Sequence, residues 1–143
     1  RAEPLYKIAK IQRINGNPNL GYLFAKIACE IPYPEDDILF ISDDIYKWQI
    51  LDEFASSAYY ATDYINGYNA CKILIDLLEK GEIPEEHRER FYENMGFYER
   101  SIKQQEEKKA GILKEISEKQ EKERQRKNKN LQNKKRKRKK KKG

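Results

Sequence analysis

The sequence predicts an all-α fold, a fragment of a right-handed α-solenoid built from helical hairpins and followed by a disordered basic tail. Three observations lead to this prediction. Apolar residues recur at three- and four-residue steps through most of the first 100 residues, which is the period of an amphipathic helix. Small residues take equivalent places in two segments, residues 1–31 and 45–80, where the helices of a hairpin must cross closely. No aromatic residue follows Tyr98, and cations dominate the end of the chain. Helical arrays of this kind bind partners more often than they do chemistry.

The first 100 residues and the remainder carry opposite net charges. Residues 1–100 contain 11 Lys/Arg and 18 Asp/Glu, a net charge of −7, whereas residues 101–143 contain 19 and 6, a net charge of +13. The first part holds all ten Tyr, all five Phe and the single Trp, enough for one small core. We therefore predict a helical-repeat domain over 1–100 with an irregular connector at 32–44, a solvated charged helix over 101–123, and a disordered Lys/Arg tail over 124–143.

Three features bear on the cellular location. No apolar run reaches the roughly 18 to 20 residues that a membrane span needs, and no apolar signal segment opens the chain. Cys29 and Cys71 lack C-x-x-C spacing, so we expect buried free thiols, which fit a reducing compartment. We therefore expect a cytoplasmic protein, with nuclear import through the basic tail as the alternative. Because the chain begins at Arg1 rather than Met, we also expect a fragment or a processed product.

The first predicted hairpin spans residues 4–31. Its first helix carries an apolar stripe and ends at the sequence NGNP. Asn17 caps the second helix, and Pro18 takes the first turn, where a missing N–H costs nothing. That helix continues to Pro32, which disfavours helical geometry in the residue before it. The two stripes consist of Leu5, Ile8, Ala9, Ile11 and Ile14, and of Leu20, Leu23, Phe24, Ile27, Ala28 and Ile31.

The connector IPYPEDDILFISDD contains an apolar run at residues 38–41, for which two interpretations compete. In sugar-nucleotide transferases an apolar strand ending in an acidic cluster presents carboxylates to a divalent metal, a pattern that Asp43 and Asp44 imitate. The alternative is that the run packs the connector against the helices, while Ser42, Asp43 or Asp44 caps the next helix. We favour the second and predict no metal site, because flanking parallel strands and a phosphate loop are missing from the sequence.

The second predicted hairpin spans residues 45–80. Its first helix has one apolar face, with Asp52 at the flank of that face and Glu53 on the far side. A turn at Thr62 and Asp63 leads into the second helix. The apolar face comprises Trp48, Leu51, Phe54, Ala55, Ala58 and Tyr59.

Two glycines have distinct roles around the second helix of that hairpin. Gly67 lies inside the helix, costs it roughly 0.5 to 1 kcal/mol and marks a close crossing. Gly81 ends the helix in left-handed geometry. A further helix, through Phe91, Met95 and Phe97, is expected to cover the last exposed face of the array.

Three interpretations of the basic tail remain open. The first is a contact for nucleic acid or an anionic surface, and the second is an import signal. The third is that the run of cations results from translation of an A-rich stretch of transcript. No aromatic residue interleaves the cations, which leaves only salt-sensitive and unspecific binding to nucleic acid. The candidate contact residues are Lys134, Lys135, Arg136, Lys137 and Arg138.

Residues 6–98 also resemble a known family. The stretch YLFAKIACEIPYPEDDILFI, the segment DDIYKWQILDE, the YY pair before a short turn and the Ala-Cys pair of the following helix are similar to the tetratricopeptide-like helical region that follows the catalytic domain in many family-2-like glycosyltransferases. The spacing of equivalent small residues, 46 positions from Gly21 to Gly67, departs from the roughly 34 of an ordinary tetratricopeptide repeat because of the connector. The resemblance implies a segment that supports a transferase by holding an acceptor, a partner or a second subunit. The family's catalytic residues lie in a domain absent here, so the resemblance implies no catalytic residue, metal or cofactor for this chain.

Two main hypotheses for function follow. The first is a non-catalytic helical-repeat module of a glycosyltransferase-like protein, which binds a protein partner or glycan acceptor or pairs with itself. The second is a free-standing adaptor whose tail binds nucleic acid or anionic surfaces. For the first, we select four tyrosines as partner contacts, with core packing as the alternative role for each. They are Tyr22, Tyr59, Tyr60 and Tyr64.

Catalysis by this chain alone is a weaker third hypothesis. Its only histidine, His87, lies among Glu85, Glu86, Arg88 and Glu89 in the first turn of a helix. We interpret it as a solvated side chain rather than a general base, because no paired nucleophile, metal-ligand spacing or phosphate loop accompanies it.

Overall fold

The computed structural model describes residues 1–37 and 40–140, with side chains described as far as residue 137. Within these residues the fold is all-helical and has no strand, which confirms the predicted fold class at this level. The elements are α1 (Glu3–Ile14), α2 (Pro18–Cys29), a π-helical turn η1 (Ile45–Gln49), α3 (Ile50–Ala58), α4 (Tyr64–Glu79), a 3₁₀ turn η2 (Glu85–His87) and α5 (Arg88–Lys140).

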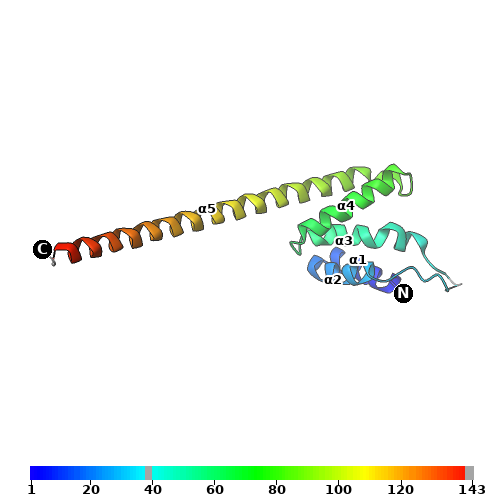
Figure 1. The fold of residues 1–143 in the computed structure, drawn as a ribbon. Helices are drawn as coiled ribbons and strands as arrows, with labels where there is room; N and C mark the ends of the chain where they lie inside the picture. Colours follow the sequence, from blue (N-terminus) through cyan, green and yellow to red (C-terminus); the bar gives the residue numbers. More distant parts are fainter. Residues whose placement is uncertain (38–39, 141–143) are drawn as a thin grey trace. The chain divides into compact units, whose positions relative to one another are not determined.

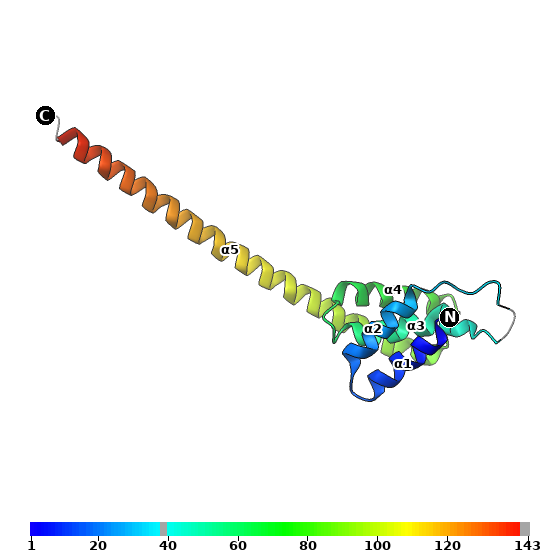
Figure 2. The same ribbon diagram turned by 90° about the horizontal axis from the view of Figure 1, so that it is seen from below.

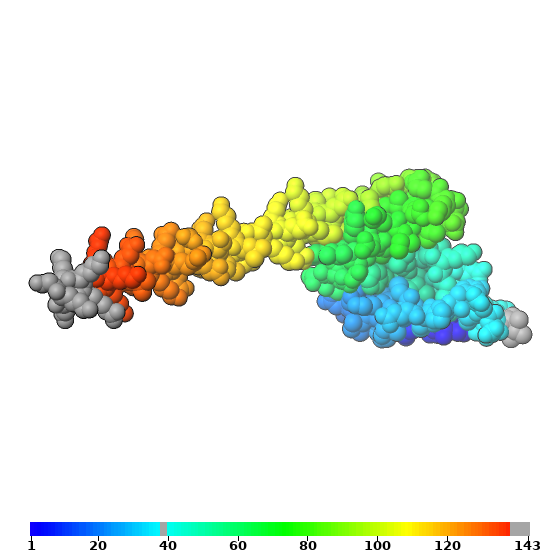
Figure 3. Space-filling model, viewed as in Figure 1, coloured from blue at the N-terminus to red at the C-terminus, as the bar shows by residue number. Residues whose placement is uncertain are grey.

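The chain divides into two compact units, residues 1–102 and residues 103–143. In the first unit α1 packs on α2, α2 on α3, and α3 on α4, so that successive helices lie side by side (Figures 1 and 2). The space-filling view shows the first helical pair, blue to cyan, in direct contact with the second, cyan to green (Figure 3). The part of α5 up to residue 102 belongs to this unit and adds Phe91 and Tyr98 to its core.

The crossing of α1 and α2 buries small side chains. Ala9, Gly21, Ala25 and Ala28 are all buried, and a Cβ on Gly21 would lie only 2.9 Å from the carbonyl oxygen of Ala9. The larger members of the expected apolar stripes lie outside this contact, because helices that approach so closely exclude bulky side chains from the face they share. Those exposed residues are Ile8, Ile11, Ile14, Leu20, Leu23 and Ile27.

The main core lies between α3, α4 and the beginning of α5. Leu74, Cys71 and Phe91 are at most 1% exposed, and Tyr98 packs beside Gly67 with its hydroxyl donating to the carbonyl oxygen of Ala55. Met95 is half-buried on the same face of α5. The expectation that Phe97 covers the core is wrong, because residues 91, 95 and 98 share one helix face at steps of four and three, and residue 97 falls off it.

Helix ends follow the sequence signals in part. Gly81 has φ of +75°, as expected for a left-handed end to α4, and Thr62 ends the preceding turn at φ of +58°. Pro18 is the first residue of α2, whereas the Asn17 side chain makes no capping bond and its amide donates to Gln12 instead (3.3 Å). Asp44 precedes the π-helical turn, also without a side-chain cap.

The connector does not pack through Phe40 as expected. Phe40 is 93% exposed, and residues 38 and 39 of the predicted apolar run lie outside the described residues. The carboxylate of Asp43 accepts a hydrogen bond from the Tyr33 hydroxyl (2.7 Å). No cluster of His, Cys, Asp or Glu suited to a metal ion occurs among the residues described.

The second unit is helical where disorder was predicted for residues 124–140, and residues 141–143 of the predicted tail lie outside the described residues. α5 continues to Lys140, and every side chain from 103 to 137 is exposed. The segment is helical because Lys, Arg, Gln and Glu have high helix propensity and neither Gly nor Pro interrupts residues 112–140. A pair four residues apart, Lys127 and Glu123, supports the helix with an ion contact of 2.7 Å. In the described part of the chain, no helix is both long and apolar enough to cross a membrane.

Candidate functional site

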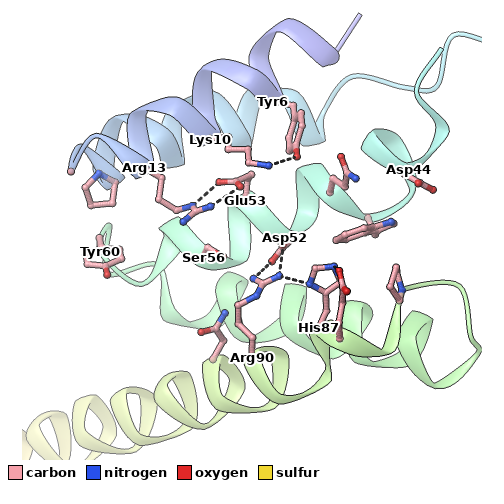
Figure 4. A pocket seen from close by; sticks show the side chains of 17 residues that line it. Tyr6, Lys10, Arg13, Asp44, Asp52, Glu53, Ser56, Tyr60, His87 and Arg90 are labelled. Carbon is pink, nitrogen blue, oxygen red and sulfur yellow. Dashed lines mark hydrogen bonds and ion pairs between the residues drawn. The ribbon is translucent and has the colours of Figure 1, made fainter. Parts of the chain in front are cut away.

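A groove of about 910 Å³ crosses the first unit (Figure 4). Its walls come from α1, from η1 with α3, and from η2 with the beginning of α5. These segments are far apart in the sequence, and the hairpin packing described above brings them together. The groove is therefore a product of the helical arrangement rather than of one loop.

An ion pair between α1 and α3 forms part of the groove wall. The Arg13 guanidinium donates to both carboxylate oxygens of Glu53, at 2.7 and 2.8 Å, and Glu53 is only 4% exposed. This hydrogen bonding raises the pKa of Arg13. The prediction that Glu53 lies on the far side of its helix, away from the buried face, is therefore wrong. Arg13, 40 positions away in the sequence, pairs with the carboxylate of Glu53 through two hydrogen bonds. This pairing allows the charge of Glu53 to be buried.

A second ion pair joins α3 to α5. Arg90 donates to the two carboxylate oxygens of Asp52 at 2.6 and 2.9 Å, and its Nη2 also donates to Nδ1 of His87 at 3.2 Å. Figure 4 shows Arg90 placed between these two side chains. Asp52 holds the pKa of Arg90 above its usual value. Both charges of this pair are therefore also matched within the fold.

His87 is half-buried rather than solvated, which corrects the sequence interpretation. Its ring stacks on Phe91 with centroids 5.7 Å apart and contacts Trp48 with centroids 4.9 Å apart. With Nδ1 already accepting from Arg90, the ring acts as packing between α5 and η1. Its other nitrogen, Nε2, lies 3.6 Å from a carboxylate oxygen of Glu86.

Two carboxamides of the groove remain available for a ligand. Gln49 on η1 and Asn94 on α5 are half-buried, and their side chains make no hydrogen bond to the described part of the chain. Each amide offers two N–H donors and a carbonyl acceptor. With the two ion pairs closed on themselves, the groove presents these two carboxamides beside the other charged side chains of its lining, Lys10, Asp44 and Glu86. Sequence periodicity gave no sign of either residue, because both lie away from the apolar stripes.

The four selected tyrosines fall into two groups. Tyr59 and Tyr60 are exposed and line a smaller pocket of about 250 Å³, and Tyr60 also lines the groove. Tyr22 lies away from both cavities, where its hydroxyl donates to Asp63 (2.8 Å) and its ring packs on Phe54. The half-buried Tyr64 packs against the rings of Tyr59 and Tyr98.

The remaining reactive and charged candidates lie elsewhere. Cys71 is fully buried, which raises the pKa of its thiol to about 12, whereas Cys29 is exposed, and both are free. The prediction that both thiols are buried is thus correct for Cys71 and wrong for Cys29. The tail cations Lys134, Lys135, Arg136 and Lys137 are exposed on α5 in the second unit, and the side chain of Arg138 lies outside what the structure describes.

Comparison with known proteins gives no further guide to this groove. No protein-family model, curated protein or solved structure matches the chain. The groove itself, with its neutralised ion pairs, free carboxamides and adjoining aromatic pocket, is therefore the basis on which function is argued.

Proposed function

We propose that this chain is a non-catalytic binding module whose groove receives an extended segment of a protein partner. The observation that carries the proposal is the groove across three helical segments, in which two bidentate ion pairs are satisfied internally while Gln49 and Asn94 have free amides. An extended peptide exposes backbone N–H and C=O groups along its length, and carboxamides pair with both. Concave surfaces of stacked helices are a common place for such binding.

The wider setting of the module is part of the same proposal. The paired helices and the small-residue crossing at Gly21 support a tetratricopeptide-like array, and the resemblance of residues 6–98 supports its place in a glycosyltransferase-like protein. In that setting the bound segment belongs to a partner or to a protein acceptor of the sugar. A glycan in the groove is the competing ligand, and pairing of the module with itself is the competing assembly.

The test is selection from a random peptide library displayed on phage, with the full chain as bait in 300 mM salt to suppress binding by the basic tail. We expect selected peptides whose affinity falls at least tenfold, about 1.4 kcal/mol, in Gln49→Lys, which places a long cation in the groove. Gln104→Lys is the matched control, because Gln104 is exposed in the second unit and the charge change is identical. If no selected peptide distinguishes the two variants, the groove does not bind peptides and the proposal fails.

The second candidate function, binding of polyanions by the tail, rests on a separate observation. Every cation between residues 124 and 137 is exposed and lies on a helix. Clustered exposed cations bind phosphate backbones by releasing counterions, without reading the base sequence. The two candidates occupy different units of the chain, so each can be tested with the other left intact.

A further inference from the structure

The smaller pocket is an aromatic cavity at the side of the groove. Its wall contains three aromatic residues, Tyr59, Tyr60 and Phe97. They are 37%, 59% and 50% exposed, respectively, so their rings are accessible to a ligand. The floor is formed by Ala55 and Tyr98. At about 250 Å³ the cavity is smaller than a typical site for a drug-sized ligand, roughly 300 to 1,000 Å³, and suits a single large side chain.

The pocket adjoins the groove. Ser56, Tyr60 and Asn94 line both cavities, so a chain lying in the groove passes the mouth of the pocket. Asn94 stands at this junction with its amide unpaired among the described residues. A backbone amide placed beside Asn94 would therefore have its own side chain within reach of the pocket.

The pocket favours an uncharged occupant. Its lining contains no Asp, Glu, Lys, Arg or His, and the Tyr98 hydroxyl already donates to the carbonyl oxygen of Ala55. Arg100, which is outside the lining, lies over the Phe97 ring at 4.7 Å from the ring centroid. A charged side chain inside would lose hydration without gaining an ionic partner from the lining residues, whereas an apolar one gains contact with three rings.

We propose that this pocket is the specificity subsite of the groove: it takes one bulky, uncharged, apolar or aromatic side chain of an extended peptide, while Asn94 pairs with the backbone of the same residue. The inference rests on the proposed function and adds the chemistry of the ligand. Deep, largely apolar contacts of this kind supply most of the binding energy of a peptide, and the polar contacts along the groove fix its register.

The test uses single-residue probes, so it does not depend on finding the natural partner. Each peptide probe is a single amino acid with an acetyl group on its nitrogen and a methylamide at its carboxyl end. We titrate the probes of Phe, Leu, Ala, Lys and Glu, and free N-acetylglucosamine, to millimolar concentrations into the full ¹⁵N-labelled chain and follow its amide signals by NMR. We expect the Phe and Leu probes to shift the Asn94 side-chain amide and the Ser56 backbone amide, with affinities at least tenfold higher than those of the Ala, Lys and Glu probes. Phe97→Glu should abolish the preference for Phe.

Tyr92→Glu is the matched control, because Tyr92 is an exposed aromatic residue on the same helix and lies outside the pocket. It should leave the Phe titration unchanged. Equal binding of the Phe and Ala probes, or shifts away from Asn94, would overturn the inference. So would saturable binding of N-acetylglucosamine at the pocket in place of the Phe probe. These outcomes leave the Gln49→Lys peptide experiment to decide the groove separately.

Discussion

The ring of Tyr98 occupies the space that a side chain at Gly67 would need. A Cβ built on Gly67 overlaps the phenol ring, which is 1% exposed and bonded to Ala55. We expect Gly67→Ala to lower the free energy of unfolding by about 1 to 3 kcal/mol, because overpacking the core outweighs the roughly 1 kcal/mol that alanine contributes to helix propensity. Urea denaturation followed by circular dichroism measures the difference.

Gly111→Ala is the control for that substitution. Gly111 lies in the same chain on a helix, but nothing approaches its Cβ position within 4 Å. This change should raise helix content slightly and leave the unfolding of the first unit unaltered. A Gly67→Ala variant as stable as the original chain would show that the ring of Tyr98 can move away at little cost.

Glu3 should make the folding stability of the first unit depend on pH in the acid range. Hydrogen bonds from Arg1, with a further one from the Tyr46 hydroxyl, lower the pKa of this buried carboxyl from 4.5 to about 2. The unfolded chain therefore binds the proton more readily, so the stabilisation is complete above pH 4.5 and is lost as the pH falls toward 2. In Glu3→Gln, the slope of stability against pH between 2 and 4.5 should fall by up to about 1 kcal/mol per pH unit.

Thermal unfolding at several pH values measures that slope. The exposed Glu99 serves as the comparison, and Glu99→Gln should retain the slope of the original chain. An unchanged slope in Glu3→Gln would mean that Arg1 does not hold this carboxyl in solution.

The sequence around each of these residues predicted some of the features and missed others. A glycine inside an apolar helix signals a close approach, and Gly67 has one, but its partner is the ring of Tyr98 on α5 rather than a crossing helix of the same hairpin. The burial of Glu53 was not predictable, since its cause is Arg13 on another helix and a carboxylate in an amphipathic pattern is assigned to solvent. Gln49 and Asn94 give no periodic signal, and only their shared groove identifies them.

At the level of elements, the turn between α3 and α4 holds backbone strain. Thr62 has φ of +58°, a left-handed conformation that β-branched residues rarely adopt, and its side chain is exposed. Thr62→Asn should therefore raise the free energy of unfolding by about 0.5 to 1 kcal/mol, because asparagine tolerates this conformation and no packing is lost. Chemical denaturation checks the gain.

Ala61→Asn is the neighbouring control, since Ala61 has no positive φ. It should give no stabilisation. If the two variants behave alike, then the turn relaxes in solution and the strain at Thr62 is not stored in the fold.

The helices of the two hairpins were largely predictable from the sequence, whereas the helix of the tail was not. The helices of both hairpins appear near the expected residues because apolar period, proline and glycine all agree there. Residues 124–143 were expected to be disordered because nothing there can form a core and because like charges repel. The helix of residues 124–140 follows from side-chain propensity, which acts at each residue and needs no core.

For the whole molecule, the decisive question is whether the tail acts independently of the groove. Eight cations between residues 124 and 137 are exposed, and ending the chain after residue 123 removes them together with the cations that follow. We expect the full chain to bind single-stranded oligonucleotides of any sequence, with the logarithm of affinity falling against the logarithm of salt at a slope of about −3 if four or five phosphates are contacted. The shortened chain should lose this binding.

Fluorescence anisotropy over a salt series measures the slope, and a groove-bound peptide from the library is measured in parallel. Its affinity should be the same in the full and the shortened chain, because the groove lies wholly within residues 1–102. Substituting Lys134, Lys135, Arg136 and Lys137 with Gln keeps the length and helix propensity of the tail and should lower the slope, since the released counterions scale with the cations in contact. Oligonucleotide binding that is insensitive to salt, or equal in the shortened chain, would place nucleic-acid binding outside the tail and remove the second candidate function.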